Sequence, residues 1–396
     1  MDAPSFADRR FHDTWLNKDA SNFVAFKKAA AKKTRHADWP LVMAVEKNIL
    51  IYDGVSVRKA AANPIARKTL MAEWADALHS GPGVIVIKNA VNDHAAIDQT
   101  TRVFEAIIAD QHKTGTGGGD HFAKPGANDR IWNALQKHCL ADPANFAAYF
   151  ASGAIGMASE AWLGPDWQMT AQLNRVNPGG AAQSAHRDYH LGFMTAARAA
   201  EFPAHVHRLS PFMTLQGAIA HCNMPLESGP TLFLPHTQNV RDGYLAFGKP
   251  EYQAHFNAHH VQLPLEKGDA VFFNPALMHA AGANRSKDIY RMANLLQVSS
   301  AFGRAMETID RIAMAKALYP ALETAKKNGA SGSAIHNAIA CAAEGYAFPT
   351  NLDRDPPIGG LAPQSQAAFM AQCLEKVVSA IEFGKALDAL EAKRKS

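Results

Sequence analysis

The chain has few cysteines, and their spacing excludes the usual zinc and disulfide arrangements. Its 396 residues include 4 cysteines, none of them in a C-x-x-C pair. Cysteines that lie far apart in this way indicate free thiols in a reducing compartment. We therefore expect a cytoplasmic protein. The cysteines are Cys139, Cys222, Cys341 and Cys373.

Long apolar runs and a strong net charge are also missing. No stretch approaches the roughly 20 apolar residues that cross a bilayer, and residues 1–10 lack the apolar core of a secretory signal. The formal net charge of +4 is small for this length and argues neither for nor against a nucleic-acid partner. The lysines and arginine between residues 27 and 35 are better explained as a solvated helix face. We expect neither a membrane nor a nucleic acid as partner.

Two common catalytic motifs are absent. The glycine-rich stretch 114–120 is not followed by the Gly-Lys-Ser/Thr of a phosphate-binding loop and does not follow a predicted strand. We interpret it as a flexible loop that can cover an active site. No G-x-S-x-G pattern occurs, which counts against a hydrolase that uses His and Asp as acid and base.

The most informative stretch is His186-Arg187-Asp188. On an extended strand, residues i and i+2 point to the same face, so His186 and Asp188 can reach one metal ion. A third ligand from a distant histidine would complete a 2-His-1-carboxylate site, which leaves coordination positions open for non-heme Fe(II) chemistry. The best candidate for that ligand is His279.

From residue 166 to 299 the chain reads as short strands separated by Gly and Pro turns, which indicates a β-sandwich or jelly roll. We predict a mainly β core with flanking helices, in one domain. Residues 1–82 form a helical N-terminal extension, 83–300 the core and 301–396 a helical C-terminal extension. The predicted strands are 84–87, 167–176, 212–222, 231–235, 261–265, 270–273 and 291–299, and the predicted helices are 23–33, 66–79, 95–108, 301–327, 335–344 and 367–395.

Two sets of polar residues are candidates for lining a pocket. The first shares one face of the strand 167–176, and polar residues on an inward face suggest a barrel interior that binds a ligand. The second follows the glycine-rich loop, where packing and capping explain the residues equally well. The first set is Gln168, Thr170, Gln172 and Asn174; the second is His121, Phe122, Asn128, Arg130, Trp132 and Asn133.

These pieces, in this order, resemble the phytanoyl-CoA dioxygenase-like branch of the Fe(II)/2-oxoglutarate-dependent oxygenases. The resemblance runs from about residue 83 to 300. Besides His186-Arg187-Asp188, it rests on Glu227-Ser228-Gly229-Pro230-Thr231, on Lys267-Gly268-Asp269, on the stretch from His279 to Ser286, and on Arg291.

The resemblance implies a double-stranded β-helix and an enzyme that uses Fe(II), 2-oxoglutarate and O2. It implies His186, Asp188 and His279 as iron ligands and Arg291 as the partner of the distal carboxylate of 2-oxoglutarate. An Arg fork suits a carboxylate bidentately in a way that Lys does not. Arg285, six residues after His279, is the competing arginine. Gln183 and Thr231 match positions that contact the cosubstrate, and Asn174 is a weaker candidate.

Two departures from the family pattern and one other class of protein bear on the function. Ala281 stands where the family often has Ser, and Pro235-His236-Thr237-Gln238 replaces the usual P-G-S-H.

A metal-binding, non-catalytic cupin-like protein is the alternative, but its first motif is usually H-x-H and it does not need Arg291. The implied reaction is hydroxylation of an unactivated C–H bond of a small organic molecule, with desaturation and epimerisation left open. The oligomeric state is also open.

Overall fold

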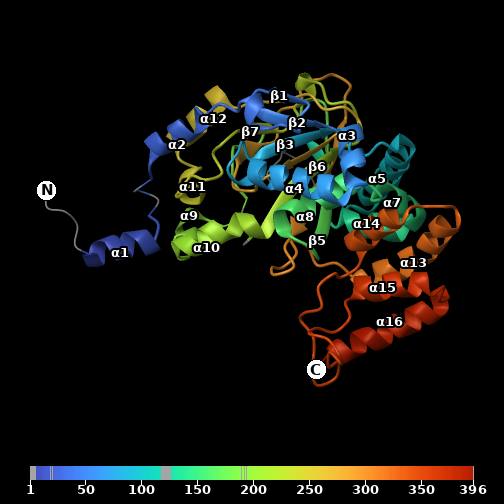
Figure 1. Cartoon of the computed structure of the whole chain (residues 1–396). Helices are drawn as coiled ribbons and strands as arrows, with labels where there is room; N and C mark the ends of the chain where they lie inside the picture. Colours follow the sequence, from blue (N-terminus) through green and yellow to red (C-terminus); the bar gives the residue numbers. More distant parts are fainter. Residues whose placement is uncertain are drawn as a thin grey trace.

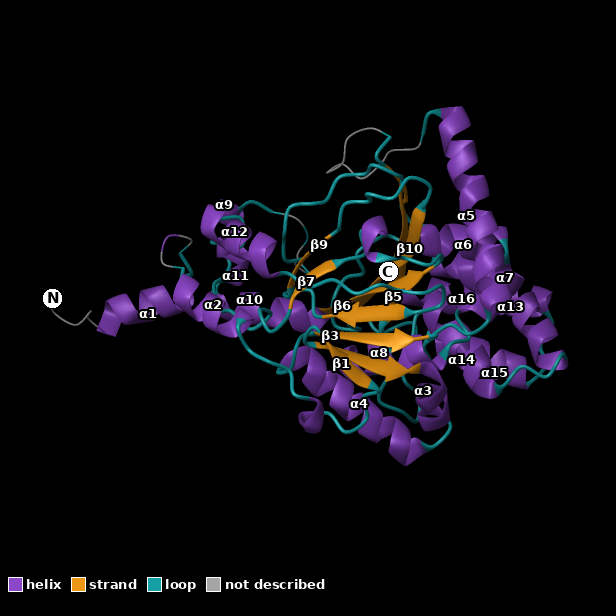
Figure 2. Ribbon diagram, turned by 90° about the horizontal axis from the view of Figure 1, so that it is seen from above, coloured by secondary structure: helices purple, strands orange, loops and turns teal. Residues whose placement is uncertain are grey.

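Two sheets that face each other form the core (Figure 2). The computed structural model describes residues 6–17, 19, 21–116, 126–188, 190, 192 and 194–395. The large sheet has the order β1-β2-β3-β8-β6-β10-β5-β4. All its neighbouring strands are antiparallel except β2 and β3. Its strands are β1 (Ala44–Glu46), β2 (Ile49–Asp53), β3 (Val84–Lys88), β4 (Asn128–Ile131), β5 (Gln168–Val176), β6 (Thr214–Ala220), β8 (Ala270–Phe273) and β10 (Arg291–Ser299).

The small sheet pairs β7 (Leu232–Leu234) with β9 (Met278–Ala280). Isolated antiparallel bridges extend it on both sides, between His186 and His279 and between Phe233 and Val261. Four extended segments therefore face β5, β10, β6 and β8 of the large sheet. This winding of one chain between two layers is a double-stranded β-helix, and the predicted jelly roll with flanking helices is confirmed.

Alternation along the strands explains why both faces of the large sheet are buried. In β3, Ile85 and Ile87 belong to the core under the helices, whereas Val84 and Val86 belong to the core shared with the small sheet. Successive side chains point to opposite faces, so a continuous apolar strand serves two cores at once.

Helices cover the outer face of the large sheet and one end of the barrel (Figure 1). Helices α13 and α14 pack against α6, α7 and α8, and α15 and α16 pack in turn on α13. Figure 1 shows these four C-terminal helices together, in orange and red. Among the described residues, every helix is too short or too polar to cross a membrane. The helices in this layer are α3 (Gly54–Ala61), α4 (Pro64–His79), α5 (His94–Thr114), α6 (Ala134–Ala141), α7 (Pro143–Tyr149), α8 (Gly153–Leu163), α13 (Arg311–Lys327), α14 (Gly332–Ala342), α15 (Gln366–Glu375) and α16 (Ala380–Arg394).

The N-terminal segment, residues 6–30 with α1 and α2, packs against a second group of helices, at the end of the barrel opposite to the first group. The ring of Phe26 packs against that of Tyr252 in a tilted arrangement, with 4.6 Å between the ring centres, and Leu16 packs with Ala199 and Leu245. Because α9 and α11 contribute walls of the cavity described below, this segment supports that wall from outside. The helices concerned are α1 (Phe6–Thr14), α2 (Phe23–Ala30), α9 (Ala196–Ala199), α10 (Ala204–Leu209), α11 (Gly243–Ala246) and α12 (Pro250–His259).

Several elements differ from the sequence prediction. Residues 1–82 are not wholly helical, because the β-branched run of β2 pairs in parallel with β3 and extends the large sheet. Residues 261–265 form bridges but no strand. The helix predicted to start at residue 301 begins at Arg311, where Asp310 caps it. The predicted helix 367–395 is divided into α15 and α16, with Val377 between them at a positive φ of 56°.

A buried chain of hydrogen bonds joins α5 and α7 to the large sheet. His221 Nδ1 donates to Thr101 Oγ1 over 2.9 Å, because that hydroxyl already donates to the Ile97 carbonyl. The other nitrogen, Nε2, then accepts from Tyr149 Oη over 2.8 Å. Burial lowers the pKa of His221 to about 3 and that of the neighbouring His138 to about 4. Both imidazoles are therefore neutral in the folded protein.

Because His221 and His138 are buried as neutral imidazoles, we expect the free energy of unfolding to fall in acid. In the unfolded chain each imidazole binds a proton below pH 6.5, the ordinary pKa of histidine. In the folded chain, His138 binds a proton only near pH 4 and His221 only near pH 3. The contribution of the two histidines to the free energy of unfolding is complete above pH 6.5. It falls toward pH 3, by up to about 1.4 kcal/mol per pH unit for each histidine. Urea unfolding between pH 7 and 5 measures this slope. His221→Gln should flatten it, whereas His36→Gln at an exposed position should not; equal slopes in all three proteins would contradict the assignment.

Candidate metal centre

The backbone brings the H-x-D stretch and the distal histidine side by side. His186 N donates to the His279 carbonyl over 2.9 Å, and His279 N donates to the His186 carbonyl over 3.0 Å. Asp188 N donates to the Pro275 carbonyl over 2.9 Å, which continues the pairing toward the loop before β9. The stretch is extended here but forms only a bridge, so the expected strand is present only as this local pairing.

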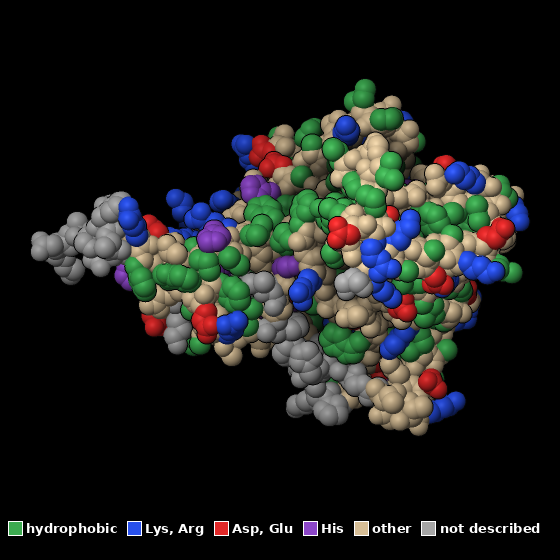
Figure 3. All heavy atoms as spheres, turned by 90° about the horizontal axis from the view of Figure 1, so that it is seen from below, with side chains coloured by type: hydrophobic (Ala, Val, Ile, Leu, Met, Phe, Trp, Pro, Cys, Tyr) green, Lys and Arg blue, Asp and Glu red, His purple; other side chains and the backbone are tan. Residues whose placement is uncertain are grey.

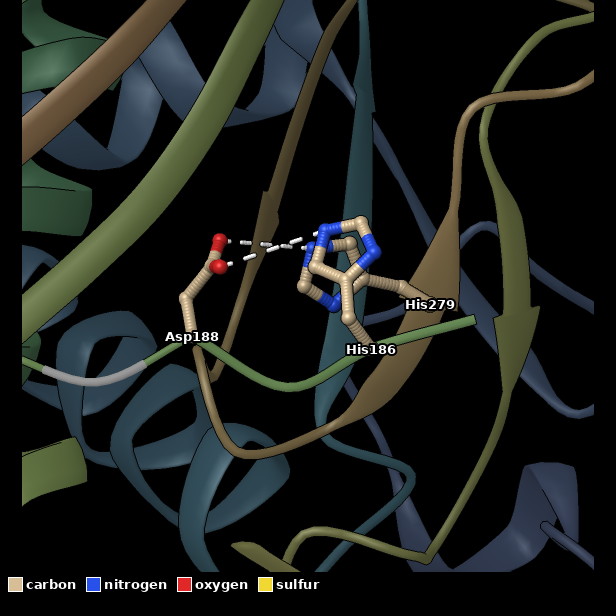
Figure 4. A group of neighbouring side chains, drawn as sticks. All are labelled: His186, Asp188 and His279. Carbon is tan, nitrogen blue, oxygen red and sulfur yellow. Dashed lines mark ion pairs between the residues drawn. The ribbon is translucent and has the colours of Figure 1, made fainter. Parts of the chain in front are cut away.

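The three side chains converge on one point (Figure 4). Their candidate ligand atoms all lie within 4.8 Å of one another. His186 Nε2 lies 3.9 Å from Asp188 Oδ1, and His279 Nε2 lies 3.6 Å from Asp188 Oδ2. Two imidazoles and one carboxylate in this arrangement make a 2-His-1-carboxylate set, which suits Fe(II) and leaves positions open for other ligands.

Backbone carbonyls fix the tautomer of both histidines. His186 Nδ1 lies 2.9 Å from the Ser184 carbonyl, and His279 Nδ1 lies 2.8 Å from the Leu277 carbonyl. A carbonyl oxygen only accepts, so each Nδ1 carries the proton and each Nε2 presents its lone pair. Such contacts orient metal-binding histidines and increase their basicity.

Asp188 is held from the opposite sheet. Gln216 Nε2 on β6 donates to Asp188 Oδ2, while Oδ1 is buried and has no hydrogen-bond partner among the described residues. Burial alone would raise the pKa of Asp188, but interactions with His279 and His186 and the hydrogen bond from the Gln216 amide lower it well below its ordinary value. The Asp188 carboxylate is therefore ionised, with Oδ2 hydrogen-bonded to Gln216 and Oδ1 available to a cation.

Arg291 is a buried cation at the start of β10. Its side chain lines the same cavity as the three clustered residues, and it is 6% exposed. Burial lowers its pKa to about 10, which leaves it charged at neutral pH. No carboxylate among the described residues pairs with it. A buried charge without a partner is costly, so this position favours an anionic ligand.

Arg285 occupies a different environment. Its side chain is exposed and does not line the cavity, while its backbone N donates to the Glu227 carbonyl over 2.7 Å. Gly229 in the same turn adopts a positive φ of 73°, and a Cβ there would lie 2.3 Å from the Ala283 carbonyl oxygen. The Glu227–Gly229 turn therefore packs closely on the loop after His279 and fixes its path.

One cavity of about 680 Å³ joins the clustered side chains to the other predicted residues. Gln183, Thr231 and Asn174 all line it. Gln183 Oε1 accepts from Ala281 N over 3.3 Å, and Asn174 Oδ1 accepts from Asn128 Nδ2 over 3.2 Å.

On the face of the molecule shown in Figure 3, Lys and Arg side chains are interspersed with Asp and Glu side chains.

The other predicted lining residues divide into three groups. Gln172, Arg130 and Trp132 line the cavity, as the polar strand face and the region after the glycine-rich loop suggested. Four described residues do not line it: Gln168, Thr170, Asn128 and Asn133. His121 and Phe122 lie outside the described residues.

Gln216 and Glu307 are lining residues that the sequence reasoning missed. Gln216 stands in a predicted strand, where Thr214 and Gln216 alternate with apolar residues, and that alternation was the available signal. Glu307 follows β10 in a stretch without regular structure. No local pattern marks it, because its position depends on how the chain turns back after residue 300.

Comparison with known proteins identifies the family. The model of the phytanoyl-CoA dioxygenase (PhyH) family matches residues 65–293. The dioxygenase aneA of Aspergillus aculeatus is 27% identical over 148 residues, which make up 37% of this chain and 44% of that protein. The match thus spans less than half of that relative's length.

Solved structures of low similarity were also found. One is the non-heme alpha ketoglutarate dependent epimerase SnoN from nogalamycin biosynthesis, with 17% identity, a TM-score of 0.40 and coverage of 60% of this chain and 82% of that one. Another is the carbocyclase SnoK from the same biosynthesis, with 17% identity, a TM-score of 0.41 and coverage of 57% and 83%.

The contact between Gln216 and Asp188 predicts a measurable effect on metal binding. Gln216→Leu removes the donor, so Oδ2 of Asp188, like Oδ1, is left without a hydrogen-bond partner among the described residues and the carboxylate is no longer oriented; metal affinity should fall by about 10- to 100-fold. Anaerobic titration with Fe(II), and with Co(II) as a spectroscopic substitute, measures this change. Gln364→Leu, at an exposed position, is the control. An unchanged affinity in Gln216→Leu would show that the contact does not orient Asp188.

Proposed function

The chain belongs to the phytanoyl-CoA dioxygenase family, and we propose that it hydroxylates an unactivated C–H bond of a small organic molecule. Enzymes of this family depend on Fe(II), 2-oxoglutarate and O2. When bound, these supply the oxidation: 2-oxoglutarate becomes succinate and CO2, one oxygen atom of O2 enters succinate, and the other converts the substrate C–H to C–OH.

In this proposal His186, Asp188 and His279 hold the iron. The fixed Nε2 lone pairs of the histidines and the unpaired Oδ1 of Asp188 are the donor set that supports it. All three are held by backbone or side-chain hydrogen bonds, so they need little reorganisation to bind a cation. The residues present therefore fit the metal that the family uses.

The observation that carries the proposal is Arg291 in the same cavity as this donor set. A metal-binding protein without catalysis gains nothing from a buried, unpaired guanidinium. A cosubstrate with a distal carboxylate neutralises it through two parallel hydrogen bonds. Gln183, Thr231 and Asn174 then serve as further cavity contacts for that cosubstrate. The cupin-like alternative is not favoured, since it leaves Arg291 unexplained.

Asp188 also bears on the outcome of the reaction. Related halogenases resemble this pattern but carry a small residue at that position, which provides room for a halide. A carboxylate there favours hydroxylation, with desaturation and epimerisation as the other outcomes of the same site. Product analysis by mass spectrometry distinguishes a gain of one oxygen atom from a loss of two hydrogens or no change of mass.

The first test is an anaerobic titration with Fe(II) followed by 2-oxoglutarate. The wild-type protein should develop the weak visible charge-transfer band of the chelated complex. His186→Ala should lose the band, and Arg291→Ala should need roughly 10- to 100-fold more 2-oxoglutarate, as expected for loss of a bidentate charged pair. Arg285→Ala is the matched control and should behave as wild type. Metal binding without a band in the wild type would contradict the proposal and favour the cupin-like alternative.

A further inference from the structure

Amide side chains line the inner face of the large sheet. They lie on three neighbouring strands, β5, β10 and β6, and are Gln172, Asn174, Gln216 and Gln297. Gln216 and Gln297 are directly opposite in the antiparallel pair of β6 and β10, so their side chains share a face and are neighbours. Arg291 lines the same face six positions earlier on β10, which corresponds to about 20 Å along an extended strand. The two glutamines and Arg291 therefore lie at opposite ends of this inner face.

Gln216 lies at the level of the candidate metal residues. Its Nε2 donates to Asp188 Oδ2. Phe273 is opposite Gln216 on β8, and the centre of its ring lies 4.7 Å from that of His279. In the proposed function 2-oxoglutarate spans the distance from Arg291 to the metal, so a group bound by the two glutamines belongs to the substrate.

The Gln216 amide has a fixed orientation and an unused acceptor. An ionised carboxylate only accepts, so the amide nitrogen must face Asp188 and the amide oxygen must face away from it. That oxygen, Oε1, is buried and has no hydrogen-bond partner among the described residues, and Gln216 as a whole is 3% exposed. A buried carbonyl oxygen without a donor is costly, so this position favours a ligand that supplies one.

Gln297 adds a second acceptor beside the first. Its Oε1 is also buried and has no hydrogen-bond partner among the described residues. The other two amides of the set are paired. Gln172 Oε1 accepts from Arg130 Nη2, and Asn174 Oδ1 accepts from Asn128 Nδ2 over 3.2 Å. Within this set of four, unused acceptors are thus confined to the two glutamines at the level of the metal residues.

We propose that Gln216 and Gln297 recognise a hydrogen-bond donor of the substrate, a hydroxyl or N–H group, close to the metal. The inference rests on the proposed function, because it names the substrate class of the same site. One hydroxyl or N–H between the two oxygens supplies the missing donor, whereas a ketone, an ether or a carboxylate has no proton to give. Leu295, Ala218 and Phe273 line the cavity around the pair and suit an apolar body. The substrate class is therefore an apolar molecule that carries an alcohol or an N–H group.

The first test needs neither metal nor ligand. In Gln297→Leu an apolar side chain of similar size replaces the unpaired acceptor, so the urea midpoint of the full chain should rise. Gln168→Leu, on β5, is the matched control, because Gln168 Nε2 donates to the carbonyls of Ser300 and Gly303 over 2.9 and 3.0 Å. That substitution removes a paired donor, and its midpoint should fall. A fall in Gln297→Leu as large as in Gln168→Leu would overturn the proposal.

The second test compares two probes that differ in one donor. 2-Naphthol and 2-fluoronaphthalene share the same rings and have nearly the same size, and only the first can donate. Both are titrated into protein loaded with Zn(II) and saturating 2-oxoglutarate, with the fluorescence of the naphthalene rings as the readout. 2-Naphthol should bind about tenfold more tightly, which corresponds to one hydrogen bond to a buried acceptor. Gln297→Leu should reduce this ratio by at least about threefold, and Gln168→Leu should leave it unchanged.

Three results of the probe titrations would refute the assignment: equal binding of the two probes by the wild-type protein, no saturable binding of 2-naphthol, or an unchanged ratio in Gln297→Leu. Gln216→Leu would not separate substrate recognition from metal binding, since the same amide also orients Asp188. Failure of the wild-type protein to form the complex with metal and 2-oxoglutarate would instead refute the proposed function. The urea comparison remains decisive for Gln297 in that case, because it requires neither of them.

Discussion

The pair of hydrogen bonds between His186 and His279 is the constraint on which the site depends. It is a single antiparallel bridge, yet it sets the spacing of two proposed ligands that are 93 residues apart in the sequence. Opposite residues of an antiparallel pair present their side chains on the same face, so the two imidazoles are neighbours as a consequence of the backbone pairing. Asp188 joins them because it lies two residues along the same extended segment.

Buried polar groups of this protein are of two kinds: some are fully hydrogen-bonded, and others, in the cavity wall, are not. Behind the large sheet, His221, Thr101 and Tyr149 satisfy one another completely. Inside the cavity, Asp188, Arg291 and Gln216 each retain an unpaired atom or charge among the described residues. Complete pairing stabilises a core, whereas incomplete pairing at a cavity wall prepares a place for a ligand at some cost in stability.

Much of the fold was predictable because local pattern and global structure agree. The alternation in residues 168–176 and the apolar run at residues 84–87 each gave the right element, and Asp93 does cap α5. The spacing of His186 and Asp188 indicated a shared face, the search for a third ligand led to His279, and the family resemblance implied the role of Arg291. The structure places these four residues around one cavity, and their roles are part of the proposal.

The rest could not be obtained from local pattern. Strands β1 and β2 are short, and their place in the sheet is decided by pairing with β3. The contact of Gln216 with Asp188 depends on two sheets facing each other, and Glu307 reaches the cavity only because the chain returns after β10. Positions fixed by long-range packing leave no periodic trace in the sequence.

Residues after β10 line the cavity, and the N-terminal segment supports one of its walls from outside. The proposed iron and cosubstrate residues, by contrast, lie on the barrel strands or on the loops that join them. In the proposed enzyme, the oxidation and part of the choice of substrate would therefore depend on separate parts of the polypeptide. Insertions and replacements in the outer parts would then change the substrate while the iron and cosubstrate residues stay intact. A descendant of this chain can in this way acquire a new substrate by mutation of its periphery alone.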